Sequence, residues 1–365
     1  MNEQASEKRQ APAWGRVLLV SVVALLVVGT GIVLIPRDSG TPPAVPFSET
    51  ARTEALAGTL LLRRSADSLA AAADPGTDAK ALGDAVTLLT THARALQDPA
   101  ASSDTSAPPS SAPPSSAETA GEPTRASFVA GLATSGRQRL DHAREADGGI
   151  ARLLAAVGSA QLLEAEKLAA AWQLPVPSPT SGSPSGSTNT APLPEAVQCP
   201  SVSPTAESTA ATTDAALAAT VRSEQEAVYV YQVALKRIDA EAAVSAARDL
   251  AVHEKLLQKA EALTRSNCGD VPAREAGYTL PTQFAEDPGA ALGTLESDSL
   301  PGFGDLIALS EGETRDWAIS GLLAAGRRSL AWGAPLPVLP GLELDADELP
   351  PWRRPVPARH DRQDS

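Results

Sequence analysis

The chain has 365 residues, a length that suits two modest domains, and its 44 acidic and 30 basic residues give a formal net charge of −14. So negative a chain is a poor partner for nucleic acid or for anionic lipid head groups. Aromatic residues make up only 3% of the chain, so a core must be built mainly from Ala, Leu and Val. Such side chains suit closely packed helices better than β-sheets, where aromatic and β-branched residues are enriched. The composition therefore predicts an all-α fold.

The first predicted element is an apolar segment at residues 17–35, which contains no charged residue. At about 1.5 Å per residue, a helix of this length crosses the roughly 30 Å hydrocarbon core of a bilayer. Lys8, Arg9 and Arg16 precede the segment, so the positive-inside rule keeps the N-terminus in the cytoplasm. We predict a single-pass signal anchor in the cell membrane, with the bulk of the chain extracytoplasmic. A cleaved secretory signal is the alternative, but the apolar run exceeds the usual h-region and no clear A-x-A site follows it.

The two cysteines fit an extracytoplasmic location. Cys199 lies in a proline-rich segment and Cys268 in the turn SNCGDVP. Two thiols in an oxidising compartment can pair, and an even number leaves none over, so we predict a disulfide between them. Two independent free thiols are the alternative. A zinc site is not indicated, because the spacing matches no zinc pattern and the chain has no CxxC motif.

Segments rich in Pro, Ser and Thr divide the rest of the chain. Such segments bury too little apolar surface to offset the entropy lost on ordering, so they predict linkers and tails. We predict a cytoplasmic N-terminus (1–16) and a transmembrane anchor (17–35), followed by a first helical bundle (48–173) that contains a Pro/Ser-rich insert (101–123). A linker (174–207), a second helical domain (208–344) and a disordered tail (345–365) complete the chain.

Helical periodicity predicts two helix pairs in the first bundle. The two pairs together are expected to form one antiparallel four-helix bundle. His92 and His142 are expected on a helix surface or in the packing of a hairpin, rather than as ligands. The predicted pairs are 48–73 with 78–97, separated by the breaker ADPGTD, and 124–145 with 149–172, separated by ADGG.

Four further helices are predicted in the second domain. The first two carry apolar residues at alternating spacings of four and three, which is typical of the inward face of a bundle helix. Pro301 falls inside the third helix and predicts a kink or a break there. The four helices are expected at about 214–240, at about 241–266, after Pro288, and at about 313–332.

Polar and charged side chains interrupt the inward faces of these helices. Glu224 and Tyr231 lie on the first, His253 on the second, Glu296 on the third and Arg315 on the fourth. Buried charges are normally paired or bound to a metal, so two interpretations stay open. In one, Glu224 forms a buried polar network with Tyr231 and Arg315, and His253 is a satisfied core histidine. In the other, Glu224, His253 and Glu296 bind iron or manganese inside the bundle.

The runs EQEAVYVY and HEKLLQKA are similar to the first two helices of ferritins. The region of about 214–342, ending AWGAPLPVLPGLEL, resembles an actinobacterial ferritin-like domain family of unknown function. The resemblance implies a ferritin-like four-helix bundle in which Glu224, His253 and Glu296 match ligands of the first three helices. Two departures from the ferritin pattern argue against a di-metal centre. A Glu-x-x-His pair would place a carboxylate three residues before His253, but that residue is Leu250. The fourth helix contains no Glu-x-x-His pair at all. We therefore expect a degenerate metal site and no cofactor.

No catalytic motif is recognisable, since the sequence lacks G-x-S-x-G, a P-loop, H-E-x-x-H and a dinucleotide fingerprint. We predict a non-enzymatic interaction or scaffold module of the cell envelope, tethered to the membrane through residues 17–35. Its partners are expected among envelope proteins that the sequence does not identify, and self-association stays open. The alternative is a metal-binding ferritin-like protein with a mononuclear site.

Overall fold

The structure is a computed structural model that describes residues 44–73, 76–97, 122–175, 211–344 and 349–351. Within these ranges the chain forms eight α-helices and one 3-10 helix and contains no β-strand, which confirms the all-α prediction for them. The chain divides into two units, Met1–Val45 and Pro46–Ser365, and every described helix belongs to the second.

Several predicted segments fall wholly or largely outside the described residues. They are the anchor at 17–35, the insert at 101–123, the linker at 174–207 and the tail at 345–365. In the part of the chain that is described, no helix is both long enough and apolar enough to cross a membrane. The signal anchor therefore stays a prediction.

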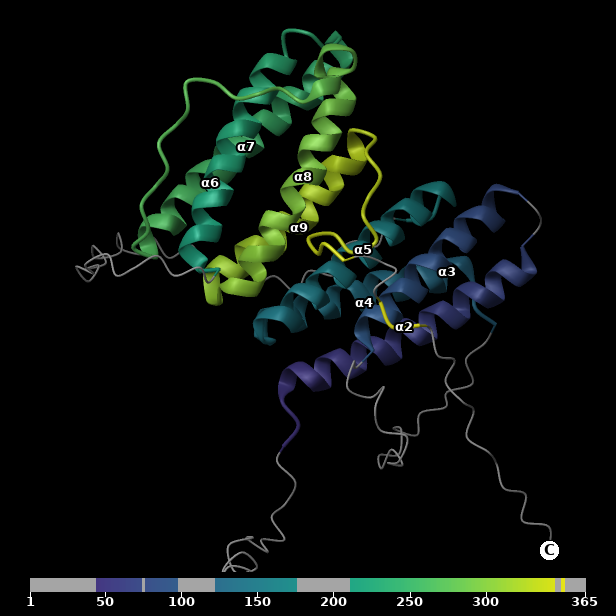
Figure 1. Cartoon of the computed structure of the whole chain (residues 1–365). Coiled ribbons are helices and arrows are strands. Elements are labelled where there is room, and N and C mark those ends of the chain that lie inside the picture. The colour runs from purple at the N-terminus through teal and green to yellow at the C-terminus, as the bar shows by residue number, and fades with distance from the viewer. Residues whose placement is uncertain (1–43, 74–75, 98–121, 176–210, 345–348, 352–365) are drawn as a thin grey trace, which may run out of the picture. The chain divides into compact units, whose positions relative to one another are not determined.

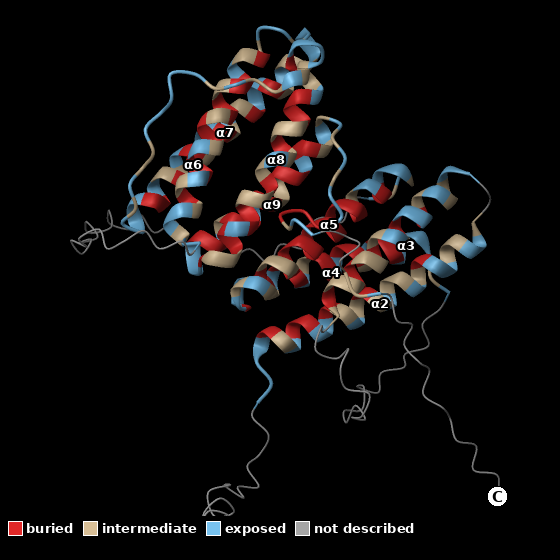
Figure 2. Cartoon of the chain, in the orientation of Figure 1, coloured by how far each residue is buried: buried red, intermediate tan, exposed pale blue. Residues whose placement is uncertain are grey.

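The first four helices begin and end within one residue of their predicted bounds. They are α2 (Phe47–Ala72), α3 (Thr77–Leu96), α4 (Arg125–Glu145) and α5 (Gly148–Ala171), shown in Figure 1. The start of α4 is fixed by a capping box, in which the Thr124 side chain accepts from the Ser127 backbone and the Ser127 side chain accepts from the Thr124 backbone. Helix α5 is the most enclosed of the four, because it packs against α2, α3 and α4 and also against α8 and α9. Figure 2 shows its largely buried surface.

The remaining elements are α6 (Thr213–Ala234), α7 (Ala240–Ser266), the 3-10 helix η2 (Thr282–Ala285), α8 (Pro288–Leu309) and α9 (Gly312–Ala331). Helix α6 ends earlier than predicted, at Ala234. Asp239 caps the start of α7, where its side chain accepts a hydrogen bond from the Ala242 backbone at 2.8 Å. Helix α8 continues through Pro301, so the predicted break does not occur.

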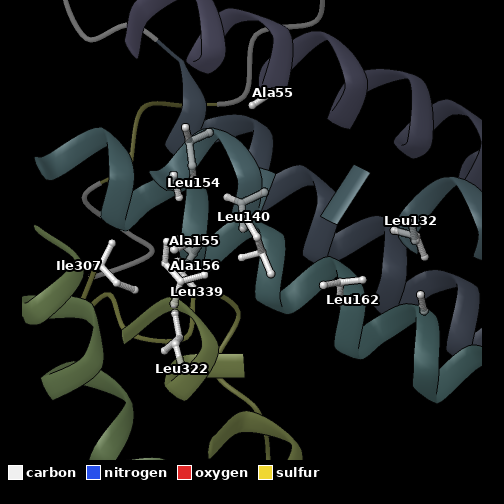
Figure 3. Close-up of a cluster of buried hydrophobic side chains, with 14 of the residues drawn as sticks. Ala55, Leu132, Leu140, Leu154, Ala155, Ala156, Leu162, Ile307, Leu322 and Leu339 are labelled. Atoms are coloured by element: carbon white, nitrogen blue, oxygen red, sulfur yellow. The ribbon is translucent and has the colours of Figure 1, made fainter. Parts of the chain in front are cut away.

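One cluster of buried apolar residues contains side chains from both sets of helices. Leu154 and Ala155 of α5 belong to it together with Ile307 of α8 and Leu322 of α9, as Figure 3 shows. Small residues allow the close approach of these helices: a Cβ added to Gly148, the first residue of α5, would collide with the carbonyl oxygen of Ala308 in α8. The α8–α9 pair is thus packed directly against α5.

The segment after α9, residues 333–344, returns across α8, and we call it the C-terminal strap. Gly341 in the strap has φ +80°, a conformation that L side chains rarely adopt. Gly304 of α8 lies directly beneath it, and a Cβ added there would collide with the Gly341 carbonyl oxygen. The strap can therefore lie on α8 only because position 304 has no side chain.

This close approach predicts opposite results for two glycines on one helix. Gly304→Ala should lower the free energy of unfolding by about 1–3 kcal/mol, because the backbones of α8 and the strap must separate. Gly302→Ala is the matched control, since a Cβ there would meet nothing within 4 Å. It should leave stability unchanged or raise it by up to about 1 kcal/mol, because Ala favours a helix over Gly. Equal effects in urea-unfolding experiments would contradict this packing of the strap.

Candidate functional site

Each of the helices α6 to α9 contributes one charged side chain to a common buried site, which we call the ion cluster. Its members are Glu224 of α6, His253 of α7, Glu296 of α8 and Arg328 of α9. Their exposed fractions are 2%, 2%, 0% and 8%, so the charged groups have almost no access to water. Burial on this scale requires that each charge be compensated by its neighbours.

His253 lies between the two carboxylates. Its Nδ1 is 2.8 Å from Oε2 of Glu224, and its Nε2 is 2.7 Å from Oε1 of Glu296. An ionised carboxylate only accepts hydrogen bonds, so both ring nitrogens must donate. An imidazole that donates from both nitrogens carries a positive charge. The geometry therefore assigns His253 as an imidazolium ion.

Glu296 joins the two cations and a tyrosine. The Tyr231 hydroxyl donates to Glu296 Oε1 at 2.7 Å, the same oxygen that accepts from His253. Nη2 of Arg328 lies 2.9 Å from the other oxygen, Oε2, which makes an ion pair by distance. The N–H bonds of Arg328 do not point along this line, so the contact is electrostatic rather than an aligned hydrogen bond.

The pKa values follow from burial and from these contacts. Burial alone lowers the pKa of His253, but hydrogen bonds to Glu224 and Glu296 and their negative charges outweigh it and raise the pKa from 6.5 to about 9. Burial raises the pKa of Glu296, but the hydrogen bond and charge of His253 and the charge of Arg328 lower it from 4.5 to about 2. At neutral pH His253 is therefore protonated and Glu296 ionised, so the two cations balance the two carboxylates.

A second layer of side chains supports the cluster. The ring of Tyr231 lies against His253 with centroids 4.9 Å apart and meets Trp332 edge-on at 6.3 Å. The indole N–H of Trp332 donates to Asp249 Oδ2 at 3.0 Å, and Asp249 is itself only 4% exposed. Burial, and then the charge of Glu296, raise the pKa of Tyr231, so its hydroxyl stays a donor.

The structure brings together four of the five predicted polar residues. Glu224, Tyr231, His253 and Glu296 all take part in this site. Arg315 does not, and the prediction that it pairs with Glu224 is wrong. Its Nε donates to the Ser310 carbonyl at 2.7 Å, and its Nη1 donates to that of Ala146, also at 2.7 Å. Arg315 lies in the first turn of α9, where it satisfies carbonyl groups left free beyond the ends of α8 and α4.

Sequence reasoning missed two residues, Arg328 and Asp249. Arg328 lies three residues after the apolar Ala325 and so on the same side of the last helix. Asp249 lies four residues before His253 and so on the same side of α7, a spacing that indicates a shared face. Both signals were present in the sequence, although neither distinguishes an inward from an outward orientation by itself.

The cluster does not fit a metal ion. Each nitrogen of His253 is already engaged by a carboxylate, and a protonated imidazole has no lone pair for a metal. Leu250 contributes no carboxylate and packs instead against two apolar clusters. Among the described residues, no group of three His, Cys, Asp or Glu side chains is arranged to hold a metal ion.

The other predicted residues lie elsewhere. Cys268 is disulfide-bonded, but Cys199 falls outside the described residues, so the pairing of the two stays a prediction. His92 is fully buried on α3, and its Nε2 lies 2.8 Å from the carbonyl oxygen of Val338 in the strap. His142 packs edge-on against Phe47, with ring centroids 5.7 Å apart.

The elements that supply the ion cluster coincide with one recognisable domain. Residues 216–344 match a domain of unknown function, DUF4439. The match begins in α6 and extends through the strap, so the DUF4439 region contains all four members of the cluster and their supporting side chains. No curated protein matches the chain, and no solved structure matches it.

The pKa of His253 predicts how stability depends on alkaline pH. Its folded-state pKa is raised, so its contribution is fully present below pH 6.5 and is lost as pH rises through about 9. At about 1.4 kcal/mol per pKa unit, the loss is on the order of 3 kcal/mol. Unfolding free energies measured between pH 6.5 and 9.5 should fall by this amount in the wild type and much less in His253→Gln. The same slope in both proteins would contradict the assignment of an imidazolium.

Two adjacent arginines provide a direct test of the ion pair on α9. Arg328→Leu should cost about 3–5 kcal/mol, because it leaves two buried carboxylates, Glu224 and Glu296, with His253 as their one remaining cation in the cluster. Arg327→Leu is the matched control: Arg327 pairs with Glu166 at 2.6 Å, but its side chain is 49% exposed. That pair should contribute at most about 1 kcal/mol. A cost for Arg328→Leu no larger than for its neighbour would show that Arg328 does not compensate a buried charge.

Proposed function

We propose that this protein is a membrane-tethered, non-enzymatic interaction module of the cell envelope, and that its DUF4439 domain is a ferritin-like bundle whose ion cluster replaces a metal centre. In this proposal the cluster has a structural role: it fixes how α6 to α9 pack, so that the bundle presents a constant surface to envelope partners. The observation that carries the proposal is the position of His253, which donates to a carboxylate from each ring nitrogen.

Charge balance supports a structural role for the cluster. Two carboxylates, one imidazolium and one guanidinium sum to zero, so no additional cation is needed to neutralise the buried acids. A divalent metal would have to displace the proton of His253 and would lie close to Arg328, which repels it. The ferritin-like assignment rests on the sequence resemblance and on the fact that Glu224, His253 and Glu296 come from three successive helices of a bundle.

The membrane tether is argued from the sequence. The apolar segment at 17–35 is long enough to span a bilayer and is preceded by basic residues. In this proposal the chain that follows the segment, with every described helix from α2 (Phe47–Ala72) onward, lies on the extracytoplasmic side of the membrane. Extracytoplasmic exposure also fits the disulfide at Cys268.

A metal-binding protein with a mononuclear site is the second candidate. The observation in its favour is that Glu224, His253 and Glu296, which are common metal-ligand types, lie in mutual contact. Binding would require loss of the proton from His253, so it would become more favourable as pH rises toward 9. The two candidates therefore differ in metal content under mildly alkaline conditions.

One preparation tests both parts of the proposal. Full-length protein with an N-terminal tag should remain in the membrane fraction with its tag intact, because the anchor is not cleaved. After mild detergent extraction at pH 8 with iron, manganese or zinc supplied, elemental analysis should find well under one equivalent of each metal. The wild type, Glu224→Gln and His253→Gln should not differ in metal content, and His142→Gln serves as the control for histidine loss.

Two results would contradict the proposal. A soluble, shortened secreted form as the main species would exclude the membrane tether. Stoichiometric metal that disappears in both Glu224→Gln and His253→Gln, but persists in His142→Gln, would favour the metal-binding candidate.

A further inference from the structure

Side chains of α3 and α5 hold the C-terminal strap through contacts with its backbone carbonyl groups. His92 of α3 contacts the Val338 carbonyl oxygen at 2.8 Å, and Nε of Arg152 on α5 donates to that of Gly341 at 2.7 Å. Farther along the chain, Arg94 of α3 donates to the carbonyl of Leu349 at 2.7 Å. The prolines at 335, 337 and 340 leave the strap few backbone donors of its own. Its hydrogen-bonded attachment to α3 and α5 therefore depends on a small number of side-chain donors.

The strap also closes part of the apolar core. Leu339 is 6% exposed and belongs to the same buried cluster as Ala156 of α5 and Leu322 of α9, and Figure 3 shows these three side chains together. Val338, beside it, is 40% exposed, whereas Pro340 is buried and Leu342 is partly buried against the same cluster, so the strap lies at the surface with several side chains directed inward. Detachment of the strap would expose this region of the core to water.

His92 is compatible with the closed strap only as a neutral ring. Because a carbonyl oxygen only accepts, Nε2 must donate to Val338, and Nδ1 then carries the lone pair of the neutral tautomer. Nδ1 is buried and has no hydrogen-bond partner among the described residues. Protonation of the ring would place a second N–H and a positive charge at this position with no acceptor.

Within the described ranges, no charged side chain compensates such a charge. Burial lowers the pKa of His92 from 6.5 to about 4, and the only opposing contribution is the Val338 carbonyl. Arg152 is paired with Asp305 at 2.6 Å, and Arg52 with Glu49, also at 2.6 Å. Among the described residues, the charged groups that contact the strap or this end of α3, directly or through one partner, include Glu49, Arg52, Arg63 and Asp67 on α2, Arg94 on α3, Arg152 on α5 and Asp305 on α8. The strap itself carries Glu343.

We propose that the C-terminal strap is a pH-sensitive closure of the helical unit, which stays shut while His92 is neutral and detaches when His92 takes up a proton. In the detached form the ring is in contact with water, where its charge is hydrated. Detachment uncovers Leu339 and the apolar residues beneath it, while the helices keep their own packing.

The direction of the effect follows from proton linkage. The open form binds a proton with an ordinary pKa near 6.5, whereas the closed form does so only near 4. The closed strap is therefore most favoured above pH 6.5 and loses that advantage as the pH falls to about 4. A difference of this size changes the ratio of open to closed forms by roughly two to three orders of magnitude.

Methyl NMR of the full-length protein tests the proposal. Leucine methyl groups are labelled, and their relaxation by a soluble paramagnetic agent is measured from pH 7 to 4. Leu339 should become several-fold more accessible, whereas Leu154 of α5, which is 0% exposed, should not change. In His92→Gln the amide can still donate to Val338 but does not titrate, so Leu339 should stay covered throughout. His142→Gln is the matched control and should behave as the wild type does.

Three outcomes would overturn the proposal. Leu339 could stay covered in the wild type at pH 4, or become accessible equally in His92→Gln, or become accessible only together with Leu154, which would indicate global unfolding. Should His92→Gln fail to fold, the ring carbon resonances of His92 in the wild type decide. Ring protonation that coincides with exposure of Leu339 supports the proposal, and exposure while the ring is neutral contradicts it.

Discussion

Four charged groups can share one water-free interior only if their charges cancel, and this constraint governs the packing of α6 to α9. Each helix supplies one member of the ion cluster, so the four helices must align at one level along the bundle. A slip of any helix by one turn, about 5.4 Å, would remove one charge from its partners and leave another buried alone. Apolar side chains tolerate such shifts far better. The cluster therefore determines the register of a bundle whose other core residues are largely Ala, Leu and Val.

Helix α8 connects this constraint to the rest of the molecule. One of its faces places Glu296 against His253 and Arg328, while Leu306 and Ile307 farther along belong to the core shared with α5. Between them, Gly304 provides the position on which the strap rests. A rotation of α8 that disturbed Glu296 would thus also disturb its contacts with α5 and with the strap. The ion cluster and the closure at His92 lie in different regions but depend on the same helix.

Helical periodicity predicted most of the architecture, because apolar spacing and breakers such as ADPGTD and ADGG are local signals. It also placed Glu224, His253 and Glu296 on inward faces, and the structure brings them into contact. The prediction that Arg315 pairs with Glu224 failed, and Arg328 was missed, because spacing alone does not settle how the last helix is rotated about its axis. The strap was not predicted, since an extended proline-rich segment has no periodicity and its contacts, such as His92 with Val338, are remote in sequence. The membrane anchor at 17–35 lies outside the described residues and rests on sequence alone.

The protonation state of His253 tests the central claim most directly. Nitrogen-15 NMR of the histidine rings in the full-length protein, recorded at neutral pH and then at increasing pH, distinguishes a ring with two protons from a ring with one. The account predicts that both nitrogens of His253 carry protons at neutral pH and that one is lost only near pH 9. A ring with a single proton at neutral pH, or a nitrogen whose resonance shows metal coordination, would contradict it.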